Sequence, residues 1–170
     1  MLSFDIRSLE SQAAHVDGRL SPEDPVWESA DMRPVEPLKV QGRLSAAGTS
    51  RFYFSGRIKG LTEIPCRRCL TDVTVGVDEE AHFIFSSEGE DAADDPDVYP
   101  FDPTAVSLDL RPAVREAWLL AVPGFALCRE DCKGLCPTCG TDWNNGTCDC
   151  VPAATESRWD TLRAIRDKLP

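Results

Sequence analysis

Eight cysteines are the residues of this chain whose type and spacing could support chemistry. Six of them fall within 23 consecutive residues, and the other two form a separate Cys66-x-x-Cys69 pair. Closely spaced thiolates bind a metal ion such as Zn²⁺, which takes four ligands in a tetrahedron. In a reducing compartment this spacing indicates a metal site before a disulfide framework. The cysteines therefore predict structural zinc.

The strongest motif spans residues 135–140, which read LCPTCG. Pro137 fixes the turn, and Gly140 permits the positive φ that lets backbone N–H groups approach the sulfurs. A second pair, Cys148 and Cys150, follows the turn at residues 144–146. We expect a first zinc site made of Cys136, Cys139, Cys148 and Cys150.

The Cys66–Cys69 pair is a weaker signal by itself. Catalytic thiol pairs usually lie at a helix N-terminus, whose dipole lowers the thiol pKa, whereas the flanks here have a strand pattern. Arg67 and Arg68 would also lower the pKa, so a thiol–disulfide or redox-sensing function through Cys66 and Cys69 stays an alternative. The structural alternative is a second zinc site shared with Cys128 and Cys132, which the count of eight permits without proving it.

No other part of the sequence has the pattern of an active site. The chain contains two histidines, His15 and His82, and no phosphate-binding glycine loop, nucleophile elbow or recognisable carboxylate pair. We therefore expect a protein that is not an enzyme and has no small-molecule substrate.

Charge is distributed unevenly along the chain. The formal net charge is −11, yet residues 39–68 hold seven Lys or Arg side chains and only one acid, Glu63. On the strand predicted at 51–59, one face is apolar and the other is basic with a tyrosine, which could contact phosphates and stack a base. A merely solvated strand face is the alternative. The candidate RNA-contact residues are Arg51, Tyr53, Arg57, Lys59, Arg67 and Arg68.

Hydrophobic periodicity predicts an α+β fold, mainly an antiparallel β-sheet with two helices and a small cysteine-rich zinc module. Residues 17–37 hold four prolines and predict an irregular connection, and residues 86–97 predict a mobile acidic loop. Gly42 marks a bulge or a close approach of two strands. The strand at 51–59 is expected to pair antiparallel with the following one. The predicted strands span residues 2–6, 38–44, 51–59 and 73–85, and a further extended stretch spans 98–108.

The first predicted helix begins after Asp109 as the N-cap and ends at Pro123-Gly124, with Trp118 as a core anchor. A last helix follows Thr155 and is expected to pack on the same unit. The predicted division is residues 1–123 for the β-rich domain, 124–150 for the zinc module and 151–170 for the C-terminal helix.

No apolar stretch approaches the ~20 residues that span a bilayer, and the N-terminus lacks the pattern of a secretory signal. We therefore expect a cytoplasmic protein without a membrane partner.

The segments 64–70 and 128–140, continuing to Asn144 and the Cys148–Cys150 pair, resemble the YceD family of bacterial proteins. The resemblance covers roughly residues 38–150. It implies a role in the synthesis, processing or stability of large-subunit (23S) ribosomal RNA, with that RNA or its precursor particle as partner, reached directly or through a ribosomal protein. Some members lack the C-terminal cysteine cluster, which favours a scaffolding role for the metal. A third alternative is an adaptor whose acidic loop binds a basic ribosomal protein.

Overall fold

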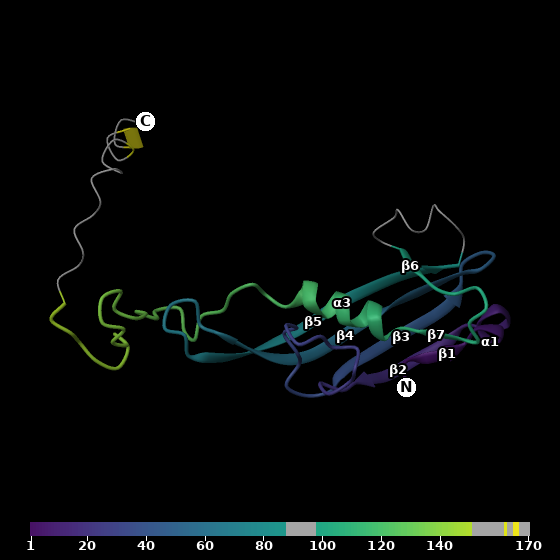
Figure 1. The fold of residues 1–170 in the computed structure, drawn as a ribbon, viewed down its shortest axis with the longest axis horizontal. Coiled ribbons are helices and arrows are strands. Elements are labelled where there is room, and N and C mark those ends of the chain that lie inside the picture. The colour runs from purple at the N-terminus through teal and green to yellow at the C-terminus, as the bar shows by residue number, and fades with distance from the viewer. Residues whose placement is uncertain (88–97, 151–161, 163–164, 167–170) are drawn as a thin grey trace.

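The computed structural model describes residues 1–87 and 98–150, together with 162, 165 and 166. A long twisted sheet forms the body, and the cysteine-rich segment lies beyond one end of it (Figure 1). In chain order the elements are β1 (Ser3–Asp5), α1 (Ile6–Ser11), β2 (Ala14–Leu20), β3 (Leu38–Ala46), β4 (Arg51–Pro65), β5 (Asp72–Ser86), β6 (Val98–Pro100), β7 (Ser107–Asp109) and α3 (Arg111–Ala121).

The main sheet has the strand order β2-β3-β4-β5-β6. All neighbours are antiparallel except β5 and β6, which pair in parallel over three residues. The predicted antiparallel pairing of β4 with β5 is confirmed, and it runs from Arg51 opposite Ser86 to Pro65 opposite Asp72. A separate two-stranded sheet joins β1 to β7. The α+β fold predicted from the sequence is therefore the observed one.

The β4–β5 hairpin is much longer than the other strand pairs. Each of its strands has 15 residues, and at ~3.4 Å per residue such a strand reaches about 50 Å. The hairpin therefore carries its turn, which holds Cys66 and Cys69, well away from the body and beside residues 124–150 (Figure 1).

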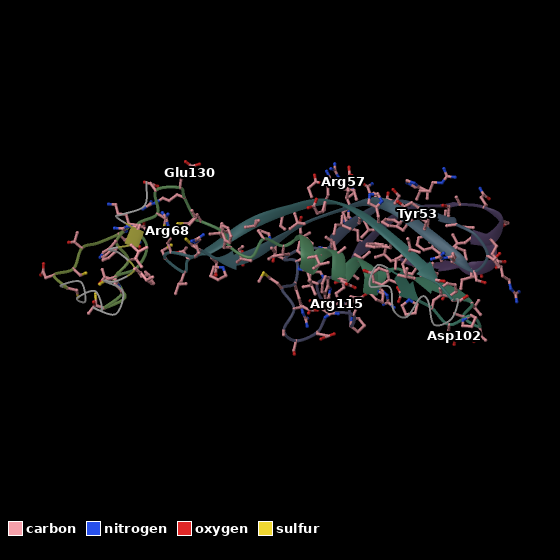
Figure 2. All side chains as sticks on the ribbon, turned by 90° about the horizontal axis from the view of Figure 1, so that it is seen from above. Tyr53, Arg57, Arg68, Asp102, Arg115 and Glu130 are labelled. Atoms are coloured by element: carbon pink, nitrogen blue, oxygen red, sulfur yellow. The ribbon has the colours of Figure 1, made fainter. Side chains whose placement is uncertain are left out.

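The inner face of the sheet buries the core under α3. Trp118 of α3 is fully buried, as predicted, and its indole Nε1 donates a hydrogen bond of 2.8 Å to the Met32 carbonyl. Figure 2 shows Tyr53 and Arg57 on one side of the sheet and α3 with Arg115 on the other. On β4, Phe52, Phe54 and Ile58 are buried, so the predicted apolar face of this strand is confirmed.

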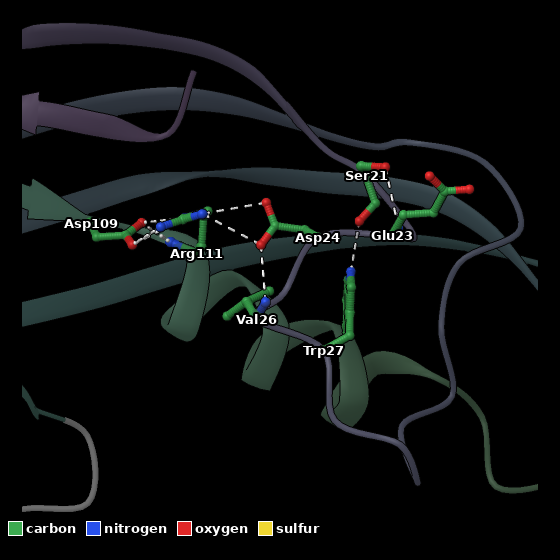
Figure 3. Close-up of polar contacts among 7 residues, drawn as sticks. All are labelled: Ser21, Glu23, Asp24, Val26, Trp27, Asp109 and Arg111. Carbon is green, nitrogen blue, oxygen red and sulfur yellow. Dashed lines mark hydrogen bonds and ion pairs between the residues drawn. The ribbon is translucent and has the colours of Figure 1, made fainter.

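The connection between β2 and β3 is fastened to α3 by ion pairs and backbone contacts. The Arg111 guanidinium contacts both Asp109, at 2.7 Å, and Asp24, at 3.5 Å, and the Trp27 indole donates to the Ser21 carbonyl (Figure 3). One turn further along α3, Arg115 binds Asp31 through two hydrogen bonds of 2.6 and 2.9 Å. This irregular segment is therefore held as a cover over the helix.

The structure corrects three predictions near the chain start and before α3. Residues 17–20 belong to β2 rather than to an irregular connection, because Val16 and Leu20 point into the core. The opening strand ends at Asp5, whose carboxylate caps the unpredicted helix α1 by accepting the Ser8 N–H at 2.8 Å. The N-cap of α3 is Leu110, not Asp109.

Two further predictions concern close packing and the 98–108 stretch. Gly42 lies opposite Gly56, and a Cβ added to Gly42 would lie 2.6 Å from the Gly56 Cα, so the predicted close approach is real. The 98–108 stretch is only partly extended: β6 and β7 occupy its ends, and a turn with Thr104 N–H donating to Asp102 separates them.

Several predictions fall wholly or partly outside the described residues. Of the acidic loop, only Ser86 and Ser87 are described, and Ser86 is a buried residue of β5. Of the C-terminal helix, Leu162, Ile165 and Arg166 are described and are helical. Its packing and the three-part division of the chain stay predictions. None of the helices that the structure describes has the length and apolar run needed to cross a bilayer.

Candidate metal centres

The first cysteine cluster forms where the tip of the β4–β5 hairpin meets the chain that follows α3. Cys66 forms a parallel bridge with Ala126, and the Arg67 N–H donates to the Ala126 carbonyl at 2.9 Å. The Arg68 side chain donates to the Cys132 carbonyl at 2.8 Å, while the Leu135 N–H donates to the Arg68 carbonyl. These backbone contacts and the Arg68 side chain therefore hold the two segments together without a metal ion.

The structure brings the four sulfurs of Cys66, Cys69, Cys128 and Cys132 within 4.8 Å of one another. The Cys66–Cys132 and Cys69–Cys128 sulfur pairs are 3.9 and 3.6 Å apart. A disulfide would need ~2.05 Å, and all eight cysteines are free. A tetrahedron with metal–sulfur bonds of ~2.3 Å has edges of about 3.8 Å. This donor set fits a single metal ion.

A second group contains Cys136, Cys139, Cys148 and Cys150, whose sulfurs also lie within 4.8 Å of one another. It is built from one short stretch of chain and is less protected. Cys136 is buried, Cys139 is exposed, and the other two are half-buried. The structure assembles the set expected from the sequence and also the second set that the sequence left as an alternative, and either could hold a metal ion.

The two C-x-x-C turns share one local geometry. In each, the N–H of the first cysteine donates to a threonine carbonyl five residues on, at 2.8 Å for Cys66 and 2.9 Å for Cys136. The residue after the second cysteine has a positive φ, 61° at Leu70 and 75° at Gly140. The sequence carries this repeat as CRRCLT and CPTCGT. The threonines, Thr71 and Thr141, were missed, although this shared pattern could have identified them.

Each cluster contains one thiol whose pKa is lowered to about 6 and one whose pKa is raised to about 12. In the first cluster, the backbone N–H of Cys128 and then that of Cys69 lower the pKa of Cys66 to about 6, whereas local desolvation of its sulfur and the neighbouring thiols raise the pKa of Cys128 to about 12, although the residue as a whole is exposed. In the second, the Thr141 hydroxyl lowers the pKa of Cys139 to about 6, and contact with Cys139 raises that of Cys150 to about 12. A divalent cation would remove the repulsion that keeps the thiols of raised pKa protonated.

Two neighbouring residues, Trp143 and Asn144, donate hydrogen bonds to sulfurs of different clusters, and Asn144 serves the first. Its side-chain nitrogen donates to the Cys132 sulfur at 3.5 Å, and its oxygen accepts the Lys133 N–H at 2.8 Å. The adjacent Trp143 donates through its indole to the Cys148 sulfur of the second cluster at 3.4 Å. Hydrogen bonds of this kind orient metal ligands and favour their thiolate form.

Comparison with known proteins assigns this cysteine-bearing chain to a family. The family model described as "Large ribosomal RNA subunit accumulation protein YceD" matches residues 54–166, which include all eight cysteines. The chain belongs to the YceD family. Family membership was predicted from the two cysteine motifs, and it is confirmed.

One curated YceD relative extends the comparison to plants. "Large ribosomal RNA subunit accumulation protein YCED homolog 1, chloroplastic" of Arabidopsis thaliana is 28% identical over 73 residues, which is 43% of this chain. The match covers 23% of the relative, so less than a quarter of its length is compared. No solved structure matches this YceD chain.

The outer face of the sheet in this YceD chain holds four of the six predicted RNA-contact residues. Arg51, Tyr53, Arg57 and Lys59 are all on the exposed side of β4. Arg57 and Lys59 both bind Asp78 of β5, at 3.0 and 2.7 Å, and the Tyr53 hydroxyl bonds His82. Arg57 and Lys59 are therefore partly neutralised, which the sequence pattern of β4 alone could not show.

The other two predicted RNA-contact residues lie at the hairpin tip, far from that face. Arg68 binds the carbonyls of Cys132 and, at 3.4 Å, Glu130. The Arg67 guanidinium lies over the Phe125 ring, 4.9 Å from its centroid. Both side chains thus serve the junction between the hairpin and the cluster.

The sequence did not identify three cations of the outer face as RNA-contact candidates, because they lie on strands next to β4: Arg19, Lys39 and Arg43. Arg19, Lys39 and Lys59 stand opposite one another across β2, β3 and β4, and Arg43 is also exposed on β3. Arg19 was assigned to an irregular connection, so its place in the sheet could not be seen. Lys39 and Arg43 were counted in the basic segment but not placed on this face.

Proposed function

We propose that this chain is a non-enzymatic factor that supports the synthesis, processing or stability of large-subunit (23S) ribosomal RNA. Membership of a family described by large ribosomal RNA subunit accumulation is the observation that carries this proposal. The test is the ratio of large- to small-subunit ribosomal RNA in cells that lack the gene, with and without the wild-type chain. We expect the large-subunit share to fall and to recover. An unchanged ratio would contradict the proposal.

The two cysteine clusters are proposed to hold structural Zn²⁺. Two sets of four thiols, each with its sulfurs within 4.8 Å of one another, support it, and in the first set two sulfur pairs are 3.6 and 3.9 Å apart. The first set would cross-link the hairpin tip to the segment after α3, and the second would close residues 136–150. Metal analysis of protein purified without reductant should find two zinc ions per chain and few titratable thiols. A reversible Cys66–Cys69 disulfide with no bound metal would instead support the redox alternative.

The outer face of the sheet is the proposed RNA contact. Its exposed cations on β2, β3 and β4 outnumber the acids on the same strands, and Tyr53 lies among them. We expect Arg19, Lys39, Arg43, Arg51 and Tyr53 to contribute most, because Arg57 and Lys59 are already paired with Asp78.

The RNA contact is tested by a matched pair of double variants. Lys39→Gln with Arg43→Gln should weaken binding of a single-stranded large-subunit RNA fragment and reduce its salt slope by about 1.4 units, since each phosphate contact contributes ~0.7. Arg7→Gln with Lys133→Gln removes the same charge from exposed positions elsewhere and should leave the slope unchanged. Equal effects of the two pairs would show that the face is only solvated.

A further inference from the structure

The hairpin strand β5 has one edge that is largely unpaired. Along its other edge it pairs with β4 at all 15 residues, but β6 covers only Ile84–Ser86. Over residues 72–83, no strand in the described part of the chain pairs with this edge. An open strand edge presents backbone N–H and C=O groups that can accept an additional strand.

A groove of about 610 Å³ runs along part of this edge. Residues 79–84 of β5 form one side and α3 forms the other, while Tyr99 of β6 and Tyr53 of β4 also line it. Leu120 of α3 lines the groove and is 81% exposed. The volume is within the range of sites that bind peptides and ligands, and the shape gives an added strand both a backbone partner and an apolar contact.

The charges that line the groove are all negative. Glu79, Glu80 and Glu116 face it, and no Lys or Arg lines it. Glu80 lies 4.0 Å from Arg57, whereas Glu79 and Glu116 make no ion pair with any described residue. This field repels a phosphate backbone and attracts a cationic segment. The acidic edge therefore differs in kind from the basic outer face of β2–β4.

We propose that the groove along the β5 edge binds a basic, extended peptide segment of a partner protein as an added β-strand. Its backbone bonds to residues 79–83, its basic side chains lie near Glu79 and Glu116, and an apolar side chain contacts Leu120. This groove adjoins the proposed RNA contact at Tyr53, but the inference does not depend on RNA binding.

The probe is a labelled peptide of alternating lysine and valine, eight residues long, added to the full-length protein. We expect fluorescence anisotropy to show binding that weakens with salt, and no binding of the glutamate–valine peptide of the same length. Two more peptides carry backbone N-methyl groups at either the odd or the even residues. An added strand uses the N–H groups of only one set, so one N-methylated peptide should lose binding and the other should retain it.

Charge variants locate the site. Glu79→Lys with Glu116→Lys should weaken binding of the lysine–valine peptide by about tenfold or more, because two attractive contacts become repulsive. Glu10→Lys with Glu63→Lys makes the same change in net charge at exposed sites away from the groove and should alter affinity little. Thermal unfolding of both double variants verifies that the fold is intact.

Hydrogen exchange supplies the structural readout. Bound peptide should slow exchange at amides of residues 79–83 and leave the exposed face of β2 and β3 unchanged. Three results would overturn the proposal: equal binding of both N-methylated peptides, equal loss in the two charge variants, or protection of this edge by a single-stranded RNA instead of the peptide.

Discussion

The two cysteine clusters use the same turn but connect different amounts of chain. The first joins residues as far apart as Cys66 and Cys132, from the hairpin tip and from the segment after α3, and three of its four cysteines are buried. The second lies wholly within residues 136–150 and has one buried cysteine. One local geometry can therefore serve either to hold distant parts together or to order a short loop, depending only on where its partner cysteines lie.

The largest difference should follow from removing one ligand of each cluster. Cys66→Ser and Cys139→Ser each remove one of four ligands, so each variant should lose one metal ion. Because a structural zinc site contributes about 10 kcal/mol to the folding of small domains, the segments around the lost ion should then be destabilised. Hydrogen exchange should then increase around residues 61–75 and 126–135 for Cys66→Ser, but only within 136–150 for Cys139→Ser. Identical exchange patterns, or unchanged metal content in both, would remove the distinction between the clusters.

Trp118→Ala should destabilise the body and the first cluster but leave zinc binding by the second cluster unchanged. The change leaves a cavity under α3 and should cost about 3–5 kcal/mol in denaturant unfolding. The first cluster joins the segment after α3 to the hairpin tip, whereas the second lies wholly within residues 136–150. Chelator competition should therefore also show weaker zinc binding in the first cluster and no change in the second. Leu120→Ala on the same helix is the control, since an exposed position should change stability by less than about 0.5 kcal/mol.

Asn144→Ala should weaken the first cluster through the loss of a hydrogen bond to one of its sulfurs. The variant loses the hydrogen bond to the Cys132 sulfur and those to the Lys133 N–H, Arg129 and Asp142, so zinc affinity of the first cluster should fall by about 10–100-fold. Asn145→Ala is the matched control because, within the described part of the chain, its side chain bonds Asp142 and no cysteine. If both variants retain zinc equally well, the Asn144 side chain does not support metal binding by the first cluster.

The two turns should respond with opposite signs to exchange of their positive-φ residue. A left-handed backbone costs a non-glycine residue about 1–2 kcal/mol, and Leu70 is 64% exposed, so Leu70→Gly should strengthen the first cluster by about 1 kcal/mol. Gly140→Ala should weaken the second by a similar amount. Chelator competition measures both, with Gly146→Ala as a control at a glycine without positive φ.

The smallest effect concerns the body that carries both clusters. Arg115 lowers the pKa of Asp31 below 3.8, so this ion pair stabilises the fold above that pH and its contribution is lost as the pH falls through the lowered pKa. We expect Asp31→Asn to lower the unfolding midpoint at neutral pH and to match the wild type at strongly acid pH. A difference that persists in acid would assign the effect to something other than the charge.

The sequence predicted β5, α3 and the cysteine set within residues 136–150 because each leaves a local pattern. It ended β4 at residue 59, whereas the strand continues to Pro65, and it left open whether Cys66 and Cys69 join Cys128 and Cys132. Alternation marks β4 and β5, helical spacing marks the Trp118 face, and C-x-x-C marks the turns. The sequence could not predict the ion pairs of Arg57 and Lys59 with Asp78 or the hydrogen bond of Arg68 to the Cys132 carbonyl, because only the fold brings these partners together. Leu70 was missed for another reason: leucine gives no signal for a positive φ, whereas Gly140 does.

The length of the β4–β5 hairpin imposes an order on assembly. The second cluster can form as soon as residues 136–150 are synthesised, because closing its short loop loses little conformational entropy. The first requires the hairpin to pair along its full length and α3 to dock, since its four sulfurs meet only then. Contacts of such sequence separation form late in folding. The first cluster would therefore bind a metal ion only after the hairpin and α3 are in place, and a misfolded chain would be unable to retain that ion.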